Sequence, residues 1–162
     1  MINRLQGKNI LITGASAGIG EACAHLFAQQ GANLILTARR EQRLREMAIR
    51  LQKEYKIEVF ALGLDVRDGS AVESLISTLP DSLKNIDVLV NNAGLVLGVE
   101  KAHETPRDDV DVMLDTNVKG ILNMIRAVVP NMVARAQGHV INISSIAGHE
   151  AYPGGSVYCA SK

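Results

Sequence analysis

The sequence predicts an α/β fold: a Rossmann-type doubly wound parallel sheet in a single domain over residues 1–162. Short apolar runs alternate with segments of helical periodicity along the whole chain. This alternation is typical of βαβ units, whose strands form a mainly parallel sheet covered on both faces. A glycine-rich segment joins the first apolar run to the first helical segment, which is where such folds bind a dinucleotide.

The first half of the chain predicts two strands and two helices. Residues 9–13 (NILIT) form a buried strand, and 18–30 form the helix that follows it. Residues 33–38 (NLILTA) form the second strand, and 41–55 the second helix. The apolar residues of this helix fall on one face: Leu44, Met47, Ala48, Leu51 and Tyr55.

The second half continues the same alternation. A third strand is expected at 58–64, a helix at 69–79 and a fourth strand at 87–91 (DVLVN). A loop and helical segments then continue to about residue 136, and a fifth strand is expected at 140–143. No repeat, low-complexity segment or linker divides the chain, so one domain is expected.

Composition excludes several classes of function. The 17 basic residues balance the 17 acidic ones, so nothing indicates binding to nucleic acid or to an acidic membrane surface. No apolar run approaches the roughly 20 residues that span a bilayer, and residues 1–9 are polar, unlike a signal peptide. Two cysteines and four scattered histidines show no metal-ligand spacing, so no metal site is expected and a cytoplasmic location is favoured.

The glycine-rich segment TGASAGIG predicts a phosphate-binding loop. Glycines permit a tight turn and close approach of the backbone to a diphosphate, and the helix that follows presents free amides to the anion. A plain turn is the alternative, but the strand–turn–helix context favours the loop. The expected cofactor-binding residues of this segment are Gly14, Ser16, Ala17, Gly18, Ile19 and Gly20.

The end of the second strand favours NADP over NAD. An acidic residue there would bind the ribose 2′-hydroxyl of NAD, but the chain has Arg39 and Arg40. A guanidinium can bind the 2′-phosphate of NADP in a bidentate manner. We expect one of the two arginines, Arg40, only to begin a solvated helix.

The ends of the third and fourth strands supply further cofactor candidates. Asp65, followed by Val66, could accept a hydrogen bond from the adenine amine or could only organise its turn. In the NNAG segment, Asn91, Ala93 and Gly94 would let a cofactor ribose lie against the backbone.

A catalytic pattern occurs in the last part of the chain. Tyr158 and Lys162 are four residues apart, which places them on the same face if a helix begins near residue 157. An ammonium beneath a phenol stabilises the phenolate, and a phenol so tuned can exchange a proton with a carbonyl oxygen. Ser145 lies thirteen positions before the tyrosine. Each residue alone could be a packing or capping residue, but their conjunction in this order favours catalysis.

Five segments of the chain resemble the motifs of the short-chain dehydrogenase/reductase family. They are TGASAGIG, NNAG, TNVKG with its Asn117, NISSIAG and YCASK. The resemblance implies that Tyr158 is the general acid/base and that Lys162 supports it and holds the nicotinamide ribose. It implies that Ser145 hydrogen-bonds the reacting oxygen, and that Asn117 distorts its helix and holds a water of a proton relay. Hydride would pass between NADP(H) and a small alcohol or carbonyl substrate.

The segments around NNAG and YCASK look like the branch of this family that contains NADP-dependent 3-hydroxy acid dehydrogenases. That branch implies serine, allo-threonine or a similar small 3-hydroxy acid as substrate. The family resemblance also implies a homodimer or homotetramer assembled through a four-helix bundle.

Family members of this kind continue past the position of Lys162 with further helix, two strands and a substrate-covering loop. The chain is therefore expected to be incomplete at its C-terminus and to lack the last strands of the sheet. The alternative is a truncated, non-catalytic fragment that binds nucleotide or a partner.

Overall fold

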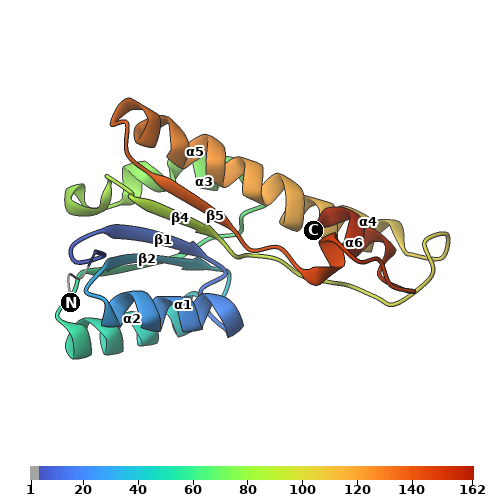
Figure 1. Ribbon diagram of the computed structural model, residues 1–162, viewed down its shortest axis with the longest axis horizontal. Helices are drawn as coiled ribbons and strands as arrows, with labels where there is room; N and C mark the ends of the chain where they lie inside the picture. The colour runs from blue at the N-terminus through green and yellow to red at the C-terminus, as the bar shows by residue number, and fades with distance from the viewer. Residues whose placement is uncertain (1–3) are drawn as a thin grey trace.

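The computed structural model describes residues 4–162 and shows five parallel strands between two layers of helices (Figure 1). The strand order is β3-β2-β1-β4-β5, so the chain moves outward from β1 in one direction and then in the other. Residues 1–3 of the polar N-terminal segment lie outside the described part. The strands are β1 (Asn9–Thr13), β2 (Asn33–Ala38), β3 (Val59–Gly63), β4 (Val88–Asn91) and β5 (His139–Asn142).

This order confirms the doubly wound parallel sheet. The reversal lies between β1 and β4, and ligands of such sheets bind outside the carboxyl ends of the strands at that point. The helices are α1 (Gly18–Gln29), α2 (Glu41–Tyr55), α3 (Gly69–Thr78), α4 (Arg107–Leu114), α5 (Gly120–Ala134) and α6 (Ser156–Ser161).

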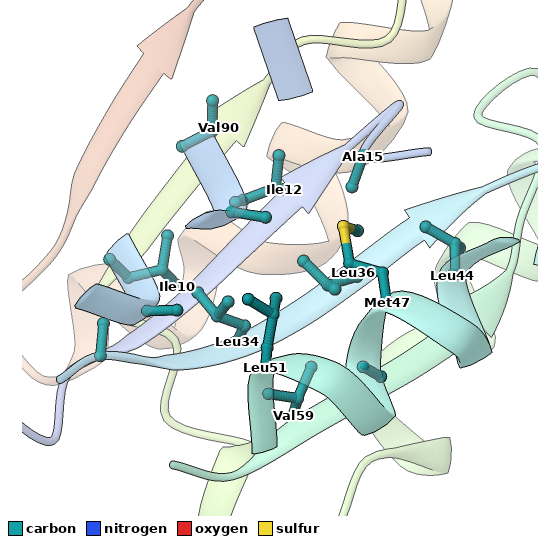
Figure 2. Close-up of a cluster of buried hydrophobic side chains, with 14 of the residues drawn as sticks. Ile10, Ile12, Ala15, Leu34, Leu36, Leu44, Met47, Leu51, Val59 and Val90 are labelled. Atoms are coloured by element: carbon teal, nitrogen blue, oxygen red, sulfur yellow. The ribbon is translucent and has the colours of Figure 1, made fainter. Parts of the chain in front are cut away.

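Helices α1 and α2 cover one face of the sheet (Figure 1). Alternate residues of the central strands, including Ile10 and Ile12 of β1, point into this layer and are fully buried. Figure 2 shows Leu44, Met47 and Leu51 of α2 packed over them. The predicted apolar face of α2 is confirmed, since its residues Leu44, Met47, Ala48 and Leu51 are buried and Tyr55 packs partly buried against the same cluster.

Helices α3 and α5 cover the opposite face (Figure 1). The intervening strand residues Leu11, Ile35 and Leu89 point into this second layer. Both faces of the central strands are therefore buried, which is why these strands read as continuous apolar runs rather than alternating ones.

The helical region after β4 is interrupted at Asn117. Between α4 and α5 the chain forms a π-helical turn, Asp115–Lys119, which agrees with the helix distortion that the family resemblance implies for Asn117. A 3-10 turn, Ile146–Gly148, follows β5 and packs against α6. Single π turns of this kind are often found at functional sites.

Two classes of feature are not found in residues 4–162. No helix there is long and apolar enough to cross a membrane. No cluster of three or more histidine, cysteine or acidic side chains in that range could hold a metal ion.

Candidate active site

A hollow of about 670 Å³ lies at the carboxyl ends of all five strands. Each strand is followed by residues that line it, from the Gly14 turn after β1 to Ile143 and Ser144 after β5. Tyr158 of α6 and Lys162 close the other side. A single hollow therefore collects segments that are up to about 150 residues apart in the sequence.

The glycine loop lies close to the end of β4. Gly14 has φ +65°, and a Cβ atom there would lie 2.9 Å from the Cα atom of Ala93. A Cβ atom on Gly20 would lie 2.5 Å from the Nδ2 atom of Asn92. Both positions therefore require glycine, one for backbone conformation and space and the other for space alone.

Thr13 and Asn92 tie these two strand ends together. The Thr13 hydroxyl oxygen accepts hydrogen bonds from the backbone amides of Asn92 and Ala93, both at 3.0 Å. The Asn92 side-chain amide donates to the carbonyl oxygens of Thr13 and Gly14 at 2.9 and 3.2 Å. These bonds hold the glycine loop and the end of β4 in a fixed position relative to each other.

The first turn of α1 faces the hollow with its amides uncapped. Ala17 is the N-cap residue and offers no side-chain hydrogen bond to the helix. Ser16, Ala17 and Ile19 line the hollow, and the Ile19 side chain is 60% exposed. This end of α1 therefore has the free amides and the dipole orientation that suit a diphosphate.

Arg39 and Arg40 both line the hollow where β2 ends. The Nε atom of Arg40 donates to the Ser16 hydroxyl at 3.1 Å, which links the arginine pair to the glycine loop. Arg40 is thus not only the first residue before a solvated helix, contrary to the preferred reading of its sequence. No carboxylate follows β2 at this position to bind a ribose 2′-hydroxyl.

The end of β3 contributes Asp65 and Val66 to the same wall. The Asp65 carboxylate is paired with the Arg67 guanidinium, with 2.7 Å between Oδ2 and Nη2. Hydrogen bonds from the Arg67 side chain are the main reason that the pKa of Asp65 is lowered from its usual value. Asp65 is therefore an anion held at the edge of the hollow.

The two asparagines at the end of β4, Asn91 and Asn92, have different surroundings. Asn91 is buried and donates from Nδ2 to the Oδ1 atom of Asn142 on β5, and it does not line the hollow. Asn92, Ala93 and Gly94 do line it. The structure thus does not place the Asn91 side chain against the hollow, because it bonds to its register partner Asn142 on β5.

Asn117 lies in the π turn and is 1% exposed. Its Oδ1 atom accepts from the Leu95 amide, and its Nδ2 atom donates to the Leu95 carbonyl and to the Ser161 hydroxyl, all at 2.9 Å. Ser161 donates in turn to the carbonyl of Tyr158. A single buried amide therefore connects the loop after β4 to the helix that carries the tyrosine.

Tyr158 and Lys162 line the hollow together, and α6 is helical over Ser156–Ser161 as the spacing predicts. The Lys162 ammonium donates to the carbonyl of Ile143 at 2.7 Å. A Cβ atom on Gly94 would lie 3.3 Å from the Asn117 Oδ1 atom and 3.4 Å from the Lys162 Nζ atom. The asparagine, the lysine and the strand end thus converge around a glycine.

Ser145 is the N-cap of the 3-10 turn, and its Oγ atom accepts from the Ala147 amide at 3.2 Å. The capping role that the sequence left open is therefore present. The hydroxyl hydrogen has no acceptor among residues 4–162, so it can still be donated to another group. Ser144, the neighbouring serine, lines the hollow, and its hydroxyl donates to the carbonyl of Lys162.

The hollow brings together most of the residues proposed from sequence. The lining residues among them are Gly14, Ser16, Ala17, Ile19, Arg39, Arg40, Asp65, Val66, Ala93, Gly94, Tyr158 and Lys162. Five others are not among the lining residues: Gly18, Gly20, Asn91, Asn117 and Ser145.

Sequence reasoning missed several lining residues, notably Asn92 and Thr116. The Thr116 hydroxyl oxygen is buried with no hydrogen-bond partner among residues 4–162. The duplicated asparagine in NNAG was a signal for Asn92, because neighbouring strand residues face opposite sides. Nothing local marked Thr116.

Comparison with known proteins identifies the family to which the chain is similar. The family model described as short chain dehydrogenase matches residues 8–162. The chain is 48% identical over 153 residues to the NADP-dependent 3-hydroxy acid dehydrogenase YdfG of Escherichia coli strain K12, covering 94% of this chain and 60% of that protein. It is 46% identical over 162 residues to the NADP-dependent 3-hydroxy acid dehydrogenase of Schizosaccharomyces pombe, covering 99% and 62%.

A solved structure agrees with these relatives. The closed form of serine dehydrogenase complexed with NADP+ matches with a TM-score of 0.88 at 48% identity, over 94% of this chain and 60% of that one. The chain spans about 60% of the length of the curated relatives it matches.

Proposed function

The chain belongs to the short-chain dehydrogenase family, and from this premise we propose that the whole protein is an NADP-dependent oxidoreductase. It transfers hydride between NADP(H) and a small alcohol or carbonyl substrate. The substrate that its relatives favour is a 3-hydroxy acid such as serine or allo-threonine. The observation that carries the cofactor choice is the arginine pair after β2, in which Arg40 is bonded to Ser16 of the glycine loop. Two guanidiniums and no carboxylate suit a ribose 2′-phosphate.

The residues present fit a dinucleotide. Gly14 and the first turn of α1 line the hollow, and this turn has no side-chain cap on its amides. Asp65 has the acceptor that an adenine amine needs. When bound, NADP(H) would supply the hydride donor or acceptor.

The proposed chemistry on the protein side is proton transfer at the substrate oxygen. Tyr158 would donate a proton to that oxygen in reduction and remove it in oxidation. The free hydroxyl hydrogen of Ser145 would stabilise negative charge on the same atom. The Lys162 ammonium, held by the carbonyl of Ile143, would favour the phenolate of Tyr158.

Asn117 supports this arrangement from behind. Its three hydrogen bonds hold the Leu95 loop and, through Ser161, the carbonyl of Tyr158. Gly94 lies between the Asn117 Oδ1 atom and the Lys162 ammonium, and the gap there would suit the water of a proton relay.

The substrate class rests on the relatives and not on the hollow. A 3-hydroxy acid carries a carboxylate that needs a cationic partner. The cations among the lining residues in the described part are Arg39 and Arg40 at the far end, and Lys162 beside the tyrosine. Another part of the whole protein would supply the carboxylate anchor.

Assembly and location complete the proposal. Leu122 and Val133 of α5, together with Val118 of the π turn, are exposed and fall on one side of the helix axis. This apolar stripe supports a homodimer or homotetramer that packs α5 against a second copy. The free thiols of Cys23 and Cys159 suit a reducing cytoplasm.

The test uses the natural polypeptide that contains this chain. Its oxidation of serine, allo-threonine and related 3-hydroxy acids is assayed by the reduction of NADP+ to NADPH or of NAD+ to NADH. The proposal expects turnover with NADP+ and much less with NAD+. Arg40→Ala should weaken NADPH binding more than NADH binding, whereas Arg50→Ala, on an exposed part of α2 away from the hollow, should alter neither.

Three results would contradict parts of this proposal. Binding of NADPH without turnover of any carbonyl would favour the non-catalytic alternative. Equal use of NAD+ would remove the role of the arginine pair. Turnover of a different carbonyl class alone would remove the 3-hydroxy acid substrate but leave the oxidoreductase.

A further inference from the structure

The Asp65–Arg67 pair is more complete than a surface ion pair. Asp65 Oδ1 accepts from the backbone amide and from the Nε atom of Arg67, both at 3.0 Å. Oδ2 accepts from the same Nε atom at 3.0 Å and from Nη2 at 2.7 Å. The arginine thus fixes both the position of the carboxylate and the rotation of its plane.

This pairing leaves part of the carboxylate exposed. Each oxygen accepts two hydrogen bonds from Arg67, with the Nε hydrogen shared between the two oxygens, and the Asp65 side chain is still 30% exposed. Asp65 lines the large hollow, whereas Arg67 instead borders a second, smaller hollow of about 340 Å³ beside α5. The arginine therefore contacts the carboxylate from the side of the smaller hollow, which we call its rear. The side that faces the large hollow is left open to a ligand.

Arg39 lies across the same end of the hollow with its charge unpaired. No hydrogen bond or ion pair involves its side chain within residues 4–162. Its charge nevertheless helps to lower the pKa of Asp65, so the two groups are close enough to interact. Asp65 would be a natural partner for Arg39 if Arg67 did not already engage it.

We propose that Arg67 is a positioning residue for the adenosine end of the cofactor site. By engaging Asp65 from the rear, it presents one carboxylate oxygen to the adenine amine and leaves Arg39 free for the 2′-phosphate. This inference rests on the proposed NADP-dependent function. Arg67 would thus influence recognition of the adenine base through Asp65, without touching the nucleotide itself.

A carboxylate whose charge is offset by an arginine also suits a polyanionic ligand. The 2′-phosphate and diphosphate of NADP would repel an unpaired Asp65. Arg67 offsets that charge without occupying the space that the nucleotide needs. The same pair could instead serve only to hold the turn between β3 and α3, and the experiment separates these two roles.

The experiment measures dissociation constants of the natural full-length protein for three nucleotides. These are NADPH, NADH and the NADPH analogue with hypoxanthine in place of adenine. Hypoxanthine has a carbonyl where adenine has the amine, so this position turns from a hydrogen-bond donor into an acceptor and is repelled by the Asp65 carboxylate. Wild type should bind NADPH on the order of tenfold more tightly than the analogue, the size expected of a hydrogen bond to a charged acceptor.

Arg67→Met should reduce that base preference to within about twofold, because Asp65 is no longer held and can turn toward Arg39. The preference for NADPH over NADH should fall by roughly three- to tenfold in the same variant, since Arg39 is then engaged. Arg67→Lys keeps the charge but lacks the two-pronged guanidinium, so its base preference should lie between the two. Arg50→Met removes one exposed charge away from the hollow and should keep both preferences.

The outcomes are distinct. If Arg67→Met lowers thermal stability but keeps both preferences, the pair only holds the turn and the inference is overturned. An equal loss of affinity for all three nucleotides would also overturn the inference. Such a loss leaves the base preference and the preference for NADPH over NADH unchanged, as a general effect of charge would. If wild type fails to bind NADPH at all, the proposed function fails first.

Discussion

At the glycine-loop end of the hollow, Gly14 and Gly20 lie within contact distance of the β4 end, and four hydrogen bonds that involve Thr13 or Asn92 join the two strand ends. At the Tyr158 end, the tyrosine and Lys162 are held by the Asn117–Ser161 bonds and by the carbonyl of Ile143.

The surroundings of the two ends differ as well. Strands β1 and β2 behind the glycine loop are buried on both faces, whereas β5 has only half-buried apolar residues. Near the Tyr158 end, Ile146 is 72% exposed and Val99 is 83% exposed. The comparison teaches that the nucleotide end is built into the core of the sheet, while the Tyr158 end depends on a few specific polar contacts.

The largest expected effect separates chemistry from binding. Tyr158→Phe should lower turnover by on the order of 10²–10⁴-fold and leave NADPH binding nearly unchanged, because only the transferable proton is lost. Steady-state kinetics and a fluorescence titration with NADPH measure the two quantities. Tyr152→Phe is the matched control, since that tyrosine packs over Gly155 and does not line the hollow. A similar loss of turnover in both variants would contradict the assignment.

The next effect tests the glycine-loop end. Gly14→Ala should destabilise the fold by about 2–4 kcal/mol, because the positive φ and the clash with the Ala93 backbone add together. Gly7→Ala shares the positive φ but has no atom within 4 Å, so it should lose only about 1 kcal/mol. Urea unfolding measures both. Equal losses would mean that contact with β4 contributes nothing.

Asn117 tests how much one polar side chain holds at the Tyr158 end. Asn117→Ala removes three buried hydrogen bonds and should lower the free energy of unfolding by about 2–3 kcal/mol, together with turnover. Asn123→Ala removes a single bond to the carbonyl of Val66 and should lose about 1 kcal/mol with turnover retained. If turnover survives the first substitution, the Tyr158 end is held by other contacts.

The smallest effect depends on pH and concerns the Asp65–Arg67 pair. Because the folded-state pKa of Asp65 is lowered by Arg67, the pair stabilises the fold above the unfolded value of about 3.9. That contribution is lost as pH falls through the lower folded-state pKa. The stability difference between wild type and Arg67→Met should therefore be constant near neutrality and shrink below about pH 4. A difference that grows on acidification would have the wrong sign.

The sequence predicted the sheet well because its signals are local. β1, β2 and α2 have the predicted bounds, since each apolar run and each helical face is set by neighbouring residues. The strand expected at 140–143 is shifted to His139–Asn142, because its ends depend on pairing with Val88 and Asn91 of β4. The residues of a single strand do not determine which residues of the neighbouring strand they pair with.

The motifs likewise identified the family and most of the wall of the hollow, because glycine spacing, the arginine pair and the tyrosine–lysine spacing are readable in order. The tertiary structure alone decided which side chains face that wall. It turned Asn91 toward β5, placed Asn92 against the glycine loop and bonded Arg40 to Ser16. It also placed Asn117 between the Leu95 loop and α6. These contacts join residues far apart in the chain, so only the packing of the folded elements can specify them.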